Sequence, residues 1–421
     1  MPTVSRGLPR QPHLEIPKRQ ARELLREWRA KNPEVLERIR RRHPKFRSVA
    51  DSALEAGPFR LSDAQLVIAR EYGFSNWAEL KERIHSNAAA GLLAAAIRAD
   101  NCDAVIQLLR ENPKLLHIPL VSGNWGPPMS HAANLGRLGI IQSIAELGAR
   151  DFQRAFDRAL LQGKIECARW LHGRGAQLAP GIVMGACETL NPDGLRFLAD
   201  LKAPFTDKNG DRLAPLALAL ETYCRKPADK HVVLKILAEQ GSDLPETPIM
   251  ALHRGDIAGL KRYLERDPSL IHRRFALGEI YPPELGCGRN GGVGMHWTPT
   301  DGTTLLHIAI DFAEMEIFNL LLEQGADVNA PALVDAAGFG GHTPIFNAVV
   351  NGNVSTGAPM ARALLDRSAS TKIRVNLRKF LDWIDEPHWH EARNVTPLEW
   401  AKTFPEKGWI NSEAVQLVEN G

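Results

Sequence analysis

A short motif recurs along this chain and constrains its fold more than any other feature. In its clearest copy, Thr304-Leu-Leu-His-Ile-Ala309, a threonine precedes apolar residues and an alanine. A threonine at a helix start can accept a hydrogen bond from the exposed amides of the first turn. A proline directly after it loses nothing, because its missing N–H would be unpaired there. The motif therefore marks helix starts in six segments, at 127–132, 214–219, 247–252, 304–309, 343–348 and 396–401.

A second apolar helix follows most copies of the motif and ends near a small residue, as Gly325 does after 320–324. One such helix pair cannot bury its apolar face alone, whereas stacked pairs bury a continuous core. The pattern predicts an all-α fold, a solenoid of about nine irregular helix-turn-helix units over residues 88–421. Residues 1–87 lack the motif and are predicted to form a separate N-terminal helical module.

The repeat resembles the ankyrin repeat. The unit nearest to that pattern spans residues 301–330, with Thr304, His307, Ala309 and Gly325-Ala-Asp-Val-Asn329 in the expected positions. His307 stands at the structural histidine position of the family and is expected to bond loop backbone. Between residues 151 and 202 the second helices end only 27 residues apart, against about 33 in the ankyrin period. These units are therefore expected to lack the usual β-finger.

The chain as a whole also resembles a group of bacterial ankyrin proteins. The resemblance runs through residues 279–287, 338–344 and 393–397. It implies an ankyrin array with enlarged finger loops, and it implies no particular activity.

Composition excludes several classes of protein. The chain has 421 residues, 44% hydrophobic and 24% charged. Its net charge is only +3, so its surface as a whole does not carry the excess of positive charge typical of nucleic-acid binding. No run of about 18 apolar residues occurs, so no membrane span is expected. The N-terminus lacks the apolar core of a signal peptide, which makes a cytoplasmic location the expectation. The five cysteines are scattered and indicate neither a disulfide framework nor a paired metal site.

The N-terminal module is strongly basic. Its first 50 residues hold 14 Lys and Arg against 5 Asp and Glu. Such a surface can bind nucleic acid or an acidic partner, but a solvated helical cap on the array explains it as well, and we favour the cap. We do not expect nucleic acid as a partner. Phe74-Ser-Asn-Trp77 with Leu80 resembles a small helical module found ahead of bacterial ankyrin arrays.

One long insertion, residues 277–301, interrupts the repeats. A connection of this length in a compact array is usually functional or disordered. Gly286, Gly288 and Gly291 match the spacing of a dinucleotide-binding loop, but no helix follows them, and we reject that interpretation. Other long connections occur at 117–126, 327–342 and 371–395, and in an ankyrin array such loops are expected to meet on the concave face.

The candidate site residues come from these loops. Carboxylates and imidazoles in one groove could carry out acid–base catalysis, and aromatic side chains could bind a polar ligand. The candidates for catalysis are Glu284, His296, Asp301, His342 and His388, and those for binding are Trp125, Tyr281, Trp297, Trp389 and His390.

Cofactors are not predicted. His388 and His390 would share one side of an extended segment, but a catalytic zinc needs about three protein ligands. A divalent metal therefore has no support from spacing. Cys287 could act as a nucleophile only beside a base such as His296.

Two functions stay open from the sequence. The first is a binding scaffold whose concave groove recognises a protein partner or a small polar ligand. The alternative is an enzyme, a hydrolase or lyase acting on a polar metabolite or glycan, with its Glu, Asp and His residues in the same groove.

Overall fold

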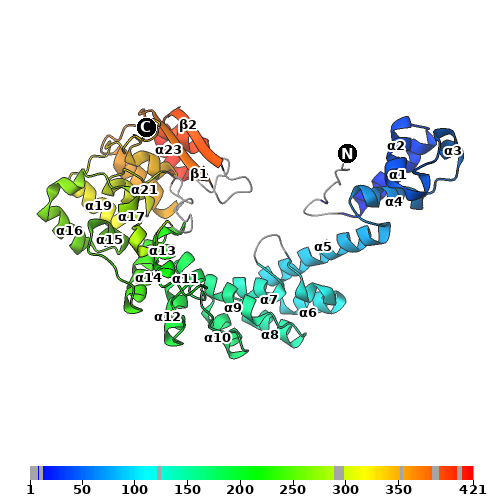
Figure 1. The fold of residues 1–421 in the computed structure, drawn as a ribbon, viewed down its shortest axis with the longest axis horizontal. Helices are drawn as coiled ribbons and strands as arrows, with labels where there is room; N and C mark the ends of the chain where they lie inside the picture. The colour runs from blue at the N-terminus through cyan, green and yellow to red at the C-terminus, as the bar shows by residue number, and fades with distance from the viewer. Residues whose placement is uncertain are drawn as a thin grey trace. The chain divides into compact units, whose positions relative to one another are not determined.

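The computed structural model describes residue 8 and residues 13–120, 125–288, 298–350, 354–381, 388–404 and 410–420. The chain forms two compact units (Figure 1), each described here by itself. Unit 1 comprises residues 1–159 and 166–176, and unit 2 comprises residues 160–165 and 177–421. The expected boundary between domains 1–87 and 88–421 falls inside one continuous helix, and that division stays a prediction.

Unit 1 is helical throughout its described part. The last two of its helices extend beyond the unit by one or two residues. Its elements are α1 (Glu15–Arg29), α2 (Pro33–Arg42), η1 (Pro44–Phe46), α3 (Asp51–Ala56), α4 (Leu61–Glu71), α5 (Trp77–Arg98), α6 (Cys102–Glu111), η2 (Pro113–His117), α7 (Pro128–Leu135), α8 (Leu138–Glu146), α9 (Phe152–Leu161) and α10 (Ile165–Gly173).

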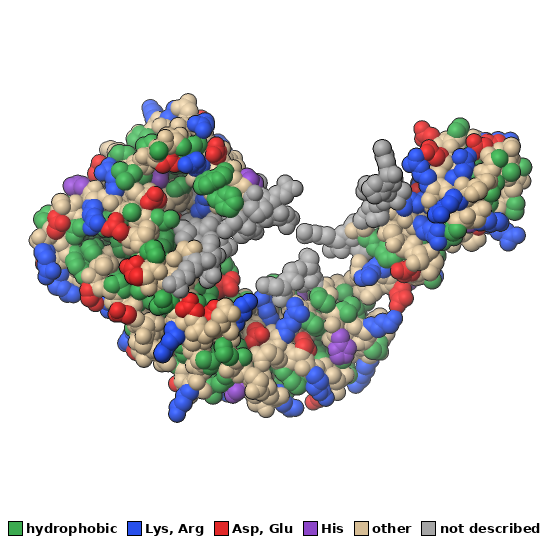
Figure 2. Space-filling view, viewed as in Figure 1, with side chains coloured by type: hydrophobic (Ala, Val, Ile, Leu, Met, Phe, Trp, Pro, Cys, Tyr) green, Lys and Arg blue, Asp and Glu red, His purple; other side chains and the backbone are tan. Residues whose placement is uncertain are grey.

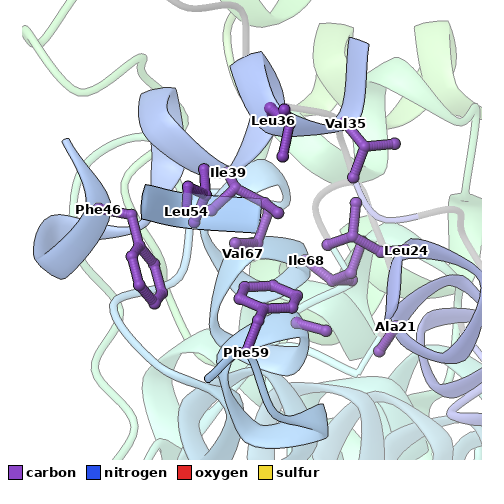
Figure 3. Close-up of a cluster of buried hydrophobic side chains, with 11 residues drawn as sticks. Ala21, Leu24, Val35, Leu36, Ile39, Phe46, Leu54, Phe59, Val67 and Ile68 are labelled. Atoms are coloured by element: carbon purple, nitrogen blue, oxygen red, sulfur yellow. The ribbon is translucent and has the colours of Figure 1, made fainter. Parts of the chain in front are cut away.

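The N-terminal module has its own apolar core (Figure 3), which α1 to α4 surround. Leu24 of α1 meets Ile39 of α2 and Ile68 of α4 there, and all three are fully or almost fully buried. Asn32 caps α2 by accepting a hydrogen bond from the Glu34 amide at 3.1 Å, as its place before Pro33 predicts. Helix α5 continues past His85 to Arg98, because the alanine-rich run after His85 favours helix.

Six of the basic side chains in this module form ion pairs within it. Figure 2 shows Lys and Arg side chains mixed with Asp and Glu side chains over this part of the chain. Ion pairs join Lys18 to Glu15, Arg19 to Glu23, Lys31 to Glu55, Arg38 to Glu71, Arg40 to Asp51 and Arg41 to Glu37. This pairing favours the interpretation of a solvated cap.

Unit 2 continues the helix pairs and adds one β-hairpin. Its helices are α11 (Met184–Glu188), α12 (Pro192–Asp200), α13 (Ala214–Glu221), α14 (Pro227–Glu239), α15 (Pro248–His253), α16 (Ile257–Arg266), η3 (Pro268–Ile271), α17 (Leu277–Ile280), η4 (Pro283–Leu285), α18 (Leu305–Asp311), α19 (Met315–Glu323), α20 (Pro344–Val349), α21 (Val354–Leu365), α22 (Pro397–Lys402) and α23 (Ser412–Asn420). The hairpin consists of β1 (Val375–Leu381) and antiparallel β2 (His388–Val395).

The prediction of about nine helix pairs is confirmed in the described residues. Three pairs, from α5–α6 to α9–α10, lie largely in unit 1, and six, from α11–α12 to α22–α23, lie in unit 2. Of the described helices, none is long and apolar enough to cross a membrane. The fold is thus an all-α repeat solenoid, with one two-stranded sheet as a local addition.

Local chemistry at the helix ends follows the sequence motif. The Thr247 hydroxyl accepts a hydrogen bond from the Met250 amide at 3.1 Å, and Thr396 caps α22 through the Glu399 amide. His307 bonds Thr304 Oγ1 at 2.8 Å on one side and donates from Nε2 to the His342 carbonyl at 3.1 Å on the other. Its expected structural role, joining its own helix start to the next loop, is confirmed.

The finger loops differ between the two parts of the array. No strand or bridge occurs in the described residues between α8 and α13, as the short repeat spacing there predicts. In the later repeats, isolated bridges join Phe275 to Thr303, Val334 to Gly340, and Gly340 to Asn376. The bridge between Gly340 and Asn376 places the finger loop after α19 beside strand β1 of the hairpin.

Candidate functional site

The finger loop after α19 is shaped by its own sequence. Asp335 Oδ1 accepts hydrogen bonds from the amides of Ala337 and Phe339 at 2.8 and 2.9 Å, which closes a tight turn. Gly340 has a φ of +125°, and a Cβ there would lie 2.0 Å from the Leu333 carbonyl oxygen. Only glycine fits at this position, and the turn leaves Leu333 and Val334 at the surface.

The β-hairpin supplies the other half of the site. Along β1 the side chains alternate between buried and more exposed positions, as period two requires. Arg378 and Phe380 occupy the more exposed face, and the register places Trp389 of β2 opposite Phe380. Their ring centroids lie 5.5 Å apart. His388 and His390 alternate to the other face from Trp389, as the sequence predicts for an extended segment.

Arg378 is held in place from three directions. Its guanidinium carbon lies 4.7 Å from the Phe339 ring centroid and 5.0 Å from that of Trp389. Its Nη2 donates to Asp335 Oδ2 at 2.8 Å. The hydrogen bonds from Phe339, from Arg378 and from Ala337 hold the pKa of the Asp335 carboxyl below its ordinary value. The pair is solvent-exposed, so it orients the arginine more than it stabilises the fold.

A cleft of about 370 Å³ lies between the finger loop and the hairpin. Its apolar walls include Leu333, Val334, Phe339 and Leu377, and its polar lining includes Asp301, Asp335, His342 and Arg378, with Trp389 at one side. The exposed fractions of Leu333, Val334 and Trp389 are 59%, 60% and 54%. We call the set Leu333, Val334, Phe339, Arg378, Phe380 and Trp389 the finger surface.

Three of the predicted site residues, Asp301, His342 and Trp389, line this one cleft. Asp301 is exposed and accepts a hydrogen bond from the Leu277 amide at 2.7 Å. His342 is buried and donates from Nε2 to the Pro299 carbonyl at 3.0 Å. Burial lowers the pKa of His342 to about 4, so at neutral pH its imidazole is uncharged.

The other predicted residues lie elsewhere. Glu284 is exposed on η4, and Tyr281 is buried 6.1 Å from the Phe312 ring. His390 bonds Thr403 Oγ1 at 2.8 Å beside α22, and its pKa is lowered first by burial and then by His388. Trp125 packs on His131 in unit 1 at 4.9 Å. His296 and Trp297 lie outside the described residues.

Two properties of the candidate residues bear on metal binding and on nucleophilic attack. In the described part of the chain, His, Cys, Asp and Glu side chains form no group of three that could hold a metal ion. Cys287 is buried, and burial followed by the charge of Glu221 raises the pKa of its thiol to about 12, which disfavours the thiolate that a nucleophile needs. The roles assigned to the candidate residues from the sequence stay predictions.

Sequence reasoning missed Leu333, Val334, Phe339 and Arg378. A signal for the first two was present, because they are large apolar residues in a loop outside the helices that form the core. For Arg378 the signal was the alternation of apolar and polar residues in 375–381. Neither signal indicates that the loop with Leu333 and Val334 lies next to the strand with Arg378.

Stacked helix pairs with aligned fingers define a solenoid repeat protein. Residues 301–332 match the family model of the ankyrin repeat, and they include the unit that carries Thr304, His307 and the 325–329 turn. The chain thus contains an ankyrin repeat, and proteins built from this repeat generally act as scaffolds for protein interactions.

Comparisons with solved structures and with curated proteins gave little further information. Among solved structures, the crystal structure of the human ASB11 ankyrin repeat domain is similar over 69% of this chain and 97% of that chain, with 19% identity and a TM-score of 0.24. A likeness at that level carries no argument about function. Comparison with curated proteins gives no match.

Proposed function

We propose that this protein is a binding scaffold that recognises a segment of a partner protein on its finger surface. The observation that carries the proposal is the cluster of exposed apolar side chains around the cleft, with Leu333, Val334 and Trp389 each more than half exposed. Single exposed apolar residues are ordinary, but a cluster rimmed by polar groups is typical of an interaction site.

The residue types of the finger surface fit this role. Tryptophan and arginine are enriched among the residues that dominate binding energy in protein interfaces. Arg378 is already oriented by Phe339, Trp389 and Asp335. Less side-chain entropy is therefore lost when a partner binds.

The expected partner is an extended segment with a large apolar side chain. A cleft of about 370 Å³ is at the lower end of the range for ligand pockets, and apolar and polar groups contribute about equally to its lining. The partner side chain would enter between Val334 and Trp389. The neighbouring backbone would pass Arg378 and Asp301, which can bond its polar groups.

The enzyme alternative has weaker support at this cleft. Acid–base catalysis needs a proton donor and acceptor within reach of one substrate atom. Asp301 and His342 both line the cleft, but the contacts described for them are to backbone groups, the Leu277 amide and the Pro299 carbonyl. The hydrolase or lyase interpretation therefore stays the second candidate.

Selection from a random peptide library displayed on phage tests the proposal. The full chain is the target, and peptides retained by the wild type are then measured against Trp389→Ala and Tyr223→Ala by calorimetry. Tyr223 is an exposed aromatic residue of the same unit, 41% exposed, between α13 and α14, and is the matched control. We expect Trp389→Ala to weaken the selected peptides at least about tenfold and Tyr223→Ala to leave them unchanged. Equal binding by wild type and Trp389→Ala would remove the basis of the proposal.

A further inference from the structure

A second arginine of the hairpin, Arg393 of β2, shares the Phe339 ring with Arg378. The guanidinium carbon of Arg393 lies 4.6 Å from the Phe339 ring centroid, and that of Arg378 lies 4.7 Å from the same point. The two guanidinium carbons can therefore lie no farther apart than the sum of these two distances. Two positive charges thus lie close together beside the cleft, which Phe339 and Arg378 line.

A β-bulge precedes the end of β2 at this point. The strand register shifts between Val375 and Leu377 of β1, and β2 has one extra residue opposite them. Asn394, next to Arg393, has a φ of +53°, a left-handed conformation that asparagine tolerates better than most residues. Bulges redirect side chains and are common beside functional sites.

Asn376 joins this bulge to the finger loop. Its Oδ1 accepts from the Asn394 amide at 2.9 Å, and its Nδ2 donates to the Gly338 carbonyl at 3.0 Å. Its own carbonyl accepts from the Gly340 amide at 2.8 Å. The two glycines flank the aromatic ring, so one residue fixes the ring and the bulge relative to each other. The guanidinium over the ring therefore needs little further ordering when a partner binds.

The charges of the two arginines are compensated to different degrees. Arg378 donates to Asp335 Oδ2 at 2.8 Å, and its side chain is 31% exposed. Arg393 Nη2 lies 4.0 Å from Glu391 Oε2, which is too far for a hydrogen bond, and its side chain is 64% exposed. Among the described residues, none forms a hydrogen bond with the Arg393 guanidinium. Arg393 is thus an oriented cation whose N–H groups face solvent.

We propose that the partner segment carries an acidic side chain, Asp or Glu, and that Arg393 binds it while the large apolar side chain of the partner enters the cleft beside Trp389. This inference rests on the proposed function. The planar fork of an arginine matches a carboxylate, because two parallel N–H···O bonds can form. The partner carboxylate replaces the distant contact of Arg393 with Glu391 by a direct one.

The strand also sets the spacing of the two partner side chains. Trp389 and Arg393 are four residues apart on β2, which is roughly 13 Å along a strand. An extended partner segment covers that length in about four residues, and an even number keeps both of its side chains on one face. We therefore expect the acidic residue about four positions from the large apolar one.

The peptides selected on the full chain test this inference. Those that lose affinity for Trp389→Ala are expected to carry Asp or Glu at the spacing above. Arg393→Gln is expected to weaken their binding about 3- to 10-fold, and Arg393→Lys to weaken it less, because lysine keeps the charge. Arg262→Gln, at an exposed position on α16, is the matched control and should leave binding unchanged. Peptides whose acid is replaced by its amide should bind the wild type and Arg393→Gln equally.

A variant with the opposite sign completes the test. Glu391→Gln removes the carboxylate that competes for Arg393, and it is expected to strengthen binding of the acidic peptides at least about twofold. Trp389-dependent peptides without an acidic residue, or no effect of either Arg393→Gln or Glu391→Gln, would overturn this inference and leave the proposed function standing. If no selected peptide depends on Trp389, the proposed function fails, and this inference fails with it.

Discussion

The guanidinium carbon of Arg378 lies 5.0 Å from the ring centroid of Trp389, on neighbouring strands of the hairpin. An arginine stacked on an aromatic ring keeps all its outward N–H groups available while losing its side-chain freedom. The finger surface thus combines a fixed donor with an apolar cleft. That combination underlies the first prediction.

Arg378→Lys is expected to weaken binding of the selected peptides by about 3- to 30-fold, because lysine neither stacks as a plane nor donates as a fork. The melting temperature should change little, since the pair with Asp335 is exposed. Calorimetry against the same peptides measures the change. Arg262→Lys, at an exposed position on α16, is the control, and an equal effect there would show that the stacked position is not special.

His307→Ala is expected to destabilise unit 2 by about 2 kcal/mol, because it leaves the His342 carbonyl and Thr304 without their buried partner. Chemical denaturation followed by circular dichroism measures it. The exposed His272→Ala serves as the matched control. A loss below about 0.5 kcal/mol would mean that the two helix starts are held together by other contacts.

His131→Leu is expected to stabilise unit 1 by about 1 kcal/mol at pH 7. His131 is fully buried, and within the part of the chain that the structure describes neither ring nitrogen has a hydrogen-bond partner. A buried polar group without a partner is costly. Leucine has no polar atom to bury and is similar in size.

The same variant has a pH signature. Burial lowers the pKa of His131 to about 4 from 6.5, so the unfolded chain binds the extra proton between these values. Wild-type stability is then lost as pH falls from about 6.5 to 4, and His131→Leu should lose less over that range. Thermal melts at pH 7, 5.5 and 4.5 compare the two, and parallel curves would contradict the prediction.

Lys202→Gly is expected to stabilise the chain by about 0.5–1 kcal/mol. Lys202 ends a second helix with a φ of +56°, where the equivalent positions in the two preceding repeats are Gly148 and Gly175. A residue with a Cβ is less stable in the left-handed conformation than glycine, because the Cβ crowds the backbone. Lys202→Ala keeps the Cβ and should bring no gain; if it stabilises as much as glycine, backbone strain is not the cause.

The repeat and its helix ends could be predicted from sequence because their causes are local. Thr247, Asn32 and His307 act on groups within a few residues, or on the next repeat at a fixed offset. The length of α5 has a local cause too, since the alanine run after His85 favours helix.

The site could be predicted only in part. Asp301, His342 and Trp389 were expected to meet, because long loops of an ankyrin array lie on one face. Arg378 and Val334 were missed because their position at one cleft depends on the register of the hairpin against the finger loop, which no local pattern determines.

The most direct test of the central claim is a hydrogen-exchange footprint of the wild type with a selected peptide bound. We expect amide protection to increase within residues 332–341 and 375–395, and Trp389→Ala to abolish this footprint at the same peptide concentration. Protection confined to other parts of the chain, with these two segments unchanged, would contradict it.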